Sequence, residues 1–210
     1  MRFARLHALP VLALLTFLMA AAAPLRPVLA AADSPPAVVE TFQSGLLDVM
    51  KVAKTLSVKE RYHRLLPVIE DGFHLRTMVR IAAGTYWEEA SEDQRRDLTA
   101  AFKRMSVTTL ATLFSGYSGQ VFKTVGQTDG AGATVLVETH LTDPDGDYHS
   151  LAYVTKNDGQ RWWIVDVIVD GGISELKVRI SEYRLILKQS GVDGLIRALN
   201  AKADALTQGT

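Results

Sequence analysis

The 210-residue sequence contains no cysteine. This absence excludes disulfide bonds, thiol nucleophiles and thiolate metal sites, so packing must hold the fold together. The sequence also lacks an excess of charge, because 23 lysine and arginine residues balance 23 aspartate and glutamate residues. Nucleic-acid-binding domains normally present a basic face. The composition therefore does not favour a nucleic acid as partner.

Apolar runs of membrane-spanning length are missing after the N-terminal region. That region differs from the rest of the chain in its order of charged, apolar and small residues. Arg2 and Arg5 precede an uncharged apolar run, and Ala30-Ala31-Ala32 follows as an A-x-A cleavage site. That order is typical of a secretory signal peptide, and the run falls short of the roughly 20 apolar residues that cross a bilayer. We predict a cleavable signal over residues 1–32, a single soluble domain over residues 33–210, and export to the periplasm. An uncleaved membrane anchor is the less favoured alternative, because Arg26 and two prolines interrupt the run.

Recognisable catalytic motifs are also missing. The sequence has no H-E-x-x-H, no G-x-S-x-G, no phosphate-binding loop and no G-x-G-x-x-G. Four histidines outside the signal, His63, His74, His140 and His149, are scattered, so we predict no metal site and no cofactor. His140 and His149 flank one hairpin and could be neighbours across strands. Exposed polar positions are the favoured interpretation of both, since no third ligand is evident.

Helical spacing of apolar residues dominates the first half of the predicted domain. Ser34 with two prolines opens a first helix. Ser57 with Glu60, and Ser91 with Gln94, form S-x-x-E/Q capping boxes that open two more. A short helical segment over residues 73–81 lies between those two.

The pattern then changes to a period of two, which predicts strands. Four strands are expected, at residues 120–125, 133–142, 148–156 and 161–170. Short turns rich in Asp, Asn and Gly separate them, which indicates an antiparallel meander. Two helices follow, over residues 174–188 and 192–206. We therefore predict an α+β fold in which N-terminal helices, a curved four-stranded antiparallel sheet and C-terminal helices enclose an apolar cavity.

The last predicted strand is apolar on both faces. Strict alternation places Trp163, Val165, Val167 and Val169 on one face, and Trp162, Ile164 and Ile168 on the other. Such a strand must be covered on both sides or curl around something. Asp166 is the exception within it. A structural pairing, with Arg179 or Arg76 as partner, is favoured over an acid–base role.

Several segments together resemble a known family. They are the stretch from Trp87 through Gln94, Phe102 and Tyr117, then Tyr153, Trp163-Ile164-Val165-Asp166-Val167, Gly172-Ile173-Ser174, Tyr183, Gly191-Val192-Asp193-Gly194-Leu195-Ile196 and Leu199. On these residues the sequence resembles the periplasmic lipid-binding proteins of the Mla pathway, also called the toluene-tolerance family. Residues 171–176 and 181–183 are similar to the hopanoid-associated branch. One departure is that the family's Tyr-Arg pair after the serine turn reads Arg179-Ile180 here.

This resemblance implies a carrier rather than an enzyme. It implies that phospholipid or hopanoid travels between the inner and outer membranes in an apolar cavity. The implied partners are an MCE-domain protein with an inner-membrane ABC transporter, and an outer-membrane lipoprotein complex. Periodicity and the family fold together predict a lipid-contacting wall of Val79, Leu110, Phe114, Val135, Val137, Tyr153, Trp163, Val165 and Tyr183. Two alternatives remain open: a small periplasmic enzyme using Asp166 and a histidine, and an adaptor that binds only protein.

Overall fold

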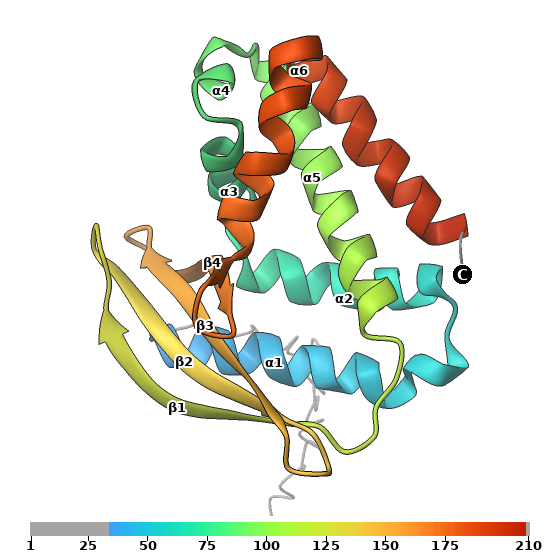
Figure 1. Ribbon diagram of the computed structural model, residues 1–210, viewed down its shortest axis with the longest axis vertical. Helices are drawn as coiled ribbons and strands as arrows, with labels where there is room; N and C mark the ends of the chain where they lie inside the picture. The colour runs from blue at the N-terminus through green and yellow to red at the C-terminus, as the bar shows by residue number, and fades with distance from the viewer. Residues whose placement is uncertain (1–33, 209–210) are drawn as a thin grey trace, which may run out of the picture.

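A computed structural model describes residues 34–208, and the predicted signal peptide lies outside them. The described chain combines helices with one antiparallel sheet, which confirms the α+β class (Figure 1). No helix in this range has the length and apolarity needed to cross a bilayer. The elements are α1 (Pro35–Val52), the 3₁₀ turn η1 (Ala53–Thr55), α2 (Val58–Gly72), α3 (Leu75–Ala83), α4 (Thr85–Glu89), α5 (Glu92–Leu113), β1 (Val121–Asp129), β2 (Thr134–Thr142), β3 (Tyr148–Asn157), β4 (Trp162–Val169), β5 (Ile173–Ser174) and α6 (Glu175–Gln208).

The helix starts lie where the capping residues predict them. The Ser34 side chain accepts a hydrogen bond from the backbone N–H of Ala37. Ser57 and Ser91 each form a complete capping box with the residue three positions on. These contacts satisfy backbone N–H groups that have no partner within the helix.

The sheet has five strands in the order β1-β2-β3-β4-β5, so the prediction of four is wrong. After the turn at Gly171, which has a φ of 74°, the chain folds back beside β4. Ile168 then pairs with Ser174, and Val169 with Ile173. A strand of two residues is too short to show a period in the sequence.

Helix α1 lies across one face of the sheet, which we call the inner face (Figure 1). Helix α2 packs on α1, α5 packs on α2, and α6 packs on α5. Phe42 of α1 joins the layers, because its ring makes edge contacts with Phe73 at 4.8 Å and with Tyr153 of β3 at 6.0 Å between centroids. The core therefore lies between the inner face and the helices.

A buried arginine connects two helix ends. Arg61 of α2 is only 7% exposed. Its guanidinium donates to the carbonyl of Ala111 near the end of α5 at 2.7 Å, and to those of Ala53 and Leu56 just after α1 at 3.1 and 2.6 Å. Carbonyls at helix ends lack partners within the helix and carry partial negative charge, which favours a cation there. Arg61 thus holds α1, α2 and α5 together.

Asp166 has a structural role, although its predicted arginine partners are wrong. Its carboxylate accepts hydrogen bonds from the Ser174 hydroxyl and from the backbone N–H groups of Val167 and Leu176. Arg179 instead pairs with Glu175 and Glu182, and Arg76 lies near Glu92 and over the Trp87 ring. Asp166 therefore attaches the beginning of α6 to β4.

Replacing Asp166 by Ala is expected to lower the free energy of unfolding by about 2–3 kcal/mol, because charge-assisted hydrogen bonds at the start of α6 are lost. Asp166→Asn keeps an acceptor oxygen and should lose less. Urea unfolding followed by circular dichroism measures both variants. Equal stability of Asp166→Ala and the unmodified protein would contradict the assigned role.

Candidate functional site

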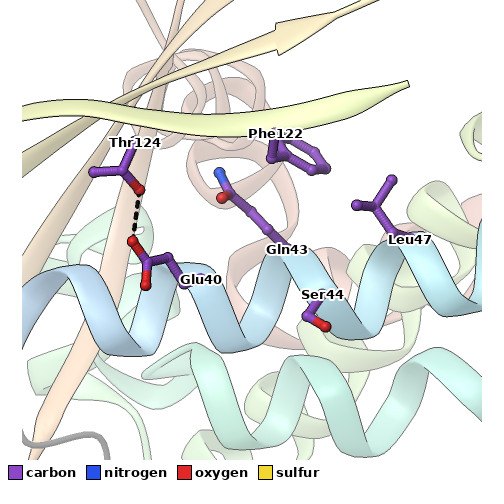
Figure 2. Close-up of a pocket in the computed structure, with 6 residues that line it drawn as sticks. All are labelled: Glu40, Gln43, Ser44, Leu47, Phe122 and Thr124. Carbon is purple, nitrogen blue, oxygen red and sulfur yellow. Dashed lines mark hydrogen bonds between the residues drawn. The ribbon is translucent and has the colours of Figure 1, made fainter. Parts of the chain in front are cut away.

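A hollow of about 230 Å³ lies between α1 and the edge strand β1 (Figure 2). Six residues line it: Glu40, Gln43, Ser44 and Leu47 from α1, and Phe122 and Thr124 from β1. The spacing of the four helical residues places them on one face of α1. The two strand residues alternate with exposed neighbours, as the pleat requires. The hollow is therefore built by one helix face and one strand face.

The rim of the hollow is polar. The Thr124 hydroxyl donates a hydrogen bond of 2.9 Å to Glu40 Oε1, which joins β1 to α1 across the gap. Both residues are near the solvent side, and Figure 2 shows their side chains meeting end to end. Leu47 and Phe122 contribute apolar surface further along the hollow.

Beneath the hollow, polar side chains continue into the interior. Gln43 is only 3% exposed, and its Nε2 donates to Thr139 Oγ1 on β2 at 3.0 Å. Burial raises the pKa of the neighbouring Tyr153 to about 12, and a hydrogen bond with the Gln43 side chain opposes that rise. We call Gln43, Thr139 and Tyr153 the inner polar seam. It links α1 to the centre of the sheet through hydrogen bonds in otherwise apolar surroundings.

The nine residues of the predicted wall occupy several places. Val79, Val137, Tyr153 and Tyr183 belong to the buried core, and Leu110 and Phe114 pack against it half-buried. Val135 is half-buried on the inner face, beside Thr155. None of the nine lines the hollow between α1 and β1. Their contact with a lipid stays a prediction.

A β-bulge changes the predicted faces of β4. Thr155 pairs with Ile164 and Val154 with Asp166, so Val165 is an extra residue in β4. Trp162 and Ile164 consequently share the inner face with Val167, whereas Trp163 lies on the outer face. The Trp163 ring N–H donates to Asp158 at 2.7 Å, and Arg161 lies over the ring. The strict alternation predicted for this strand is therefore wrong.

The histidines do not converge in the described residues. His140 stacks on Tyr148 with ring centroids 4.2 Å apart, while His149 lies 3.7 Å from Asp170. The pairing register puts the two histidines on opposite faces of the sheet. Across residues 34–208, no group of three potential metal ligands comes together.

The six residues that line the hollow were not predicted, because five of them have no local signal in the sequence. Gln43 is the one with a local signal. It is a polar residue next to Phe42 on the apolar side of a predicted helix, which indicates a buried hydrogen bond. The others depend on how β1 crosses α1, and no local pattern encodes that crossing.

Comparison with known proteins identifies a family and a solved structure of similar fold. The family model described as MlaC protein matches residues 40–201. A search of curated proteins finds no match. Among solved structures, a phospholipid-binding protein from Ralstonia solanacearum, determined in complex with a phospholipid, superposes with a TM-score of 0.72. The two share 19% sequence identity, and the match covers 82% of this chain and 98% of that one. That likeness establishes the fold, and the match over residues 40–201 establishes that the chain belongs to the MlaC protein family.

Proposed function

We propose that this chain is a periplasmic lipid carrier, and that it binds its cargo between α1 and the inner face of the sheet. The observation that carries the proposal is the hollow at that interface, in a fold shared with a protein solved in complex with a phospholipid. Membership of the MlaC family supports the same function. Carrying a lipid needs no covalent chemistry. Each CH₂ group shielded from water contributes about 0.8 kcal/mol to the free energy of binding.

Loading requires α1 and β1 to move apart. The hollow is smaller than the roughly 300–1,000 Å³ of typical ligand pockets. The contacts that must give way are the Glu40–Thr124 hydrogen bond and the inner polar seam. Each neutral hydrogen bond contributes only about 0.5–1.5 kcal/mol net, because water replaces the lost partner. Opening at the rim therefore breaks one exposed hydrogen bond, whereas opening at the seam also separates Phe42 of α1 from Tyr153 of β3 and has the larger free-energy cost.

Once admitted, an acyl chain or a polycyclic tail would first contact Tyr153 of the seam and Val137, which pairs with it on the inner face. The wall would continue through Val79, Leu110, Phe114, Val135, Val165 and Tyr183. Trp163 is not part of it, because it faces the opposite side of the sheet. Among residues 34–208, the buried Tyr183 hydroxyl finds no hydrogen-bond partner.

The cargo we propose is phospholipid or hopanoid, carried between the inner and outer membranes. An MCE-domain protein with its ABC transporter would exchange lipid at the inner membrane, and a lipoprotein complex would do so at the outer membrane. This proposal also includes three earlier predictions: the signal peptide, the single domain over residues 33–210, and membership of the hopanoid-associated branch.

Gentle purification followed by native mass spectrometry tests the function, with lipid analysis of a solvent extract. We expect phospholipid or hopanoid to remain bound. Ser44→Trp, which fills the hollow from an exposed position, should lower the bound fraction severalfold. Thr41→Trp, on an exposed face of the same helix outside the hollow, is the matched control. A protein that is lipid-free as purified and takes up no lipid from vesicles would contradict the proposal.

A further inference from the structure

Helix α6 has a basic and apolar outer face that takes no part in the hollow. Taking 100° per residue, one side of the helix between Lys177 and Lys188 is exposed over about three turns, or about 16 Å. Its residues are Lys177, Val178, Ser181, Arg184, Leu185 and Lys188. We call this side the α6 basic face.

The cations of this face have no acidic partners. In the described part of the chain, no carboxylate lies within ion-pair distance of Lys177, Arg184 or Lys188. The flanking acids, Glu175 and Glu182, are both held by Arg179, at 3.6 and 3.0 Å. The charge of the α6 basic face is therefore available to an external anion.

Helix α5 provides a contrast with the α6 basic face. Its arginines Arg95, Arg96 and Arg104 each pair with a carboxylate. The sequence after residue 32 also contains more acidic than basic residues. In the range that the structure describes, other exposed cations without an ion pair, such as Lys59, Arg64 and Lys202, lie apart from one another, whereas three such cations share one side of α6 with two exposed aliphatic residues.

Two apolar side chains lie beside these cations. Val178 and Leu185 are one helical repeat of seven residues apart, and their exposed fractions are 37% and 60%. Both residues lie on the exposed side of a single helix. Lysine, arginine and scattered aliphatic residues on one exposed helix side are typical of helices that lie on anionic lipid surfaces.

We propose that the α6 basic face binds the surface of an anionic phospholipid bilayer. The cations would approach lipid phosphates, while Val178 and Leu185 would enter the headgroup region. The small apolar area keeps this contact reversible, which a protein that leaves the membrane requires. The proposal rests on the surface of α6 and is independent of what the hollow contains.

The test is co-sedimentation of the purified protein with vesicles of phosphatidylcholine, with and without phosphatidylglycerol. We expect binding to the phosphatidylglycerol vesicles at low salt and its loss as salt rises. Replacing Lys177, Arg184 and Lys188 together by Gln should weaken binding on the order of 100-fold, at about fivefold for each charge. The matched control replaces three exposed cations elsewhere, Lys59, Arg64 and Lys202, by Gln and should bind like the unmodified protein.

The apolar contribution is tested separately. Leu185→Ser should weaken vesicle binding about tenfold, whereas Leu113→Ser, at a leucine that is 67% exposed on α5, should not. Both leucines are at the surface, so neither change should unfold the protein. The lipid content of each variant is measured in parallel, and an unchanged content separates this proposal from that of the carrier.

Three outcomes would overturn the proposal. They are equal binding by the triple variant of α6 and the unmodified protein, equal binding to vesicles with and without phosphatidylglycerol, and no binding to either vesicle. In the last case, retention on poly-L-glutamate beads that the triple variant loses would assign the face to an acidic protein partner.

Discussion

Cross-linking residue 40 to residue 124 is expected to abolish lipid uptake. In the double variant Glu40→Cys/Thr124→Cys, the shortest bis-methanethiosulfonate, which forms a reducible disulfide with each thiol, would join α1 to β1 where their side chains already meet. The hollow could then not widen, although the fold would be unchanged. The chain has no cysteine of its own, so the two introduced thiols are the only ones that react. Uptake of a fluorescent phospholipid by delipidated protein measures the effect.

The controls separate blocked opening from chemical damage. Reducing the disulfides should restore uptake in the same sample. A cross-link between Glu70→Cys and Lys103→Cys, which joins α2 to α5 at another existing side-chain contact, should leave uptake unchanged. Normal uptake by the protein linked at residues 40 and 124 would show that lipid enters somewhere other than the interface of α1 and β1.

Replacing Arg61 by Ala is expected to have the largest effect on stability, a loss of about 3–4 kcal/mol. The carbonyls of Ala111 and Leu56 would lose the donor that Arg61 provides, and the Ala53 carbonyl would keep only the Leu56 N–H. The total free energy of unfolding of a typical domain is only about 5–15 kcal/mol. Arg61→Ala should therefore remove a large part of the free energy of unfolding, and the urea concentration at the unfolding midpoint should fall.

A neighbouring arginine provides the comparison. Arg64 lies on the same helix three residues on and is exposed, so Arg64→Ala should change the free energy of unfolding by less than about 0.5 kcal/mol. Arg61→Lys keeps the charge but lacks the planar fork, so it should recover only part of the loss. Similar urea midpoints for Arg61→Ala and Arg64→Ala would contradict the role assigned to Arg61.

Local patterns in the sequence were sufficient for the helix starts and the fold class. Ser57 with Glu60, and Ser91 with Gln94, cap helices in any context, because the hydrogen bonds involve residues only three apart. The change from a period of 3.6 to a period of 2 near residue 120 likewise reflects which side of each element is buried. The boundary between the helices predicted at residues 174–188 and 192–206 is a kink within α6 at Gly191, whose φ is 62°, and a positive φ favours glycine.

Tertiary structure decided the faces and the site. The bulge at Val165 depends on how β4 pairs with β3, so alternation along β4 alone assigned Trp163 to the wrong face. The partners of Asp166 come from the turn that leads into α6, where backbone N–H groups outcompete distant arginines. The hollow exists because β1 crosses one particular face of α1. Residues 40 and 124 are 84 positions apart, and contacts over such a separation follow from the packing of the whole domain rather than from any local pattern.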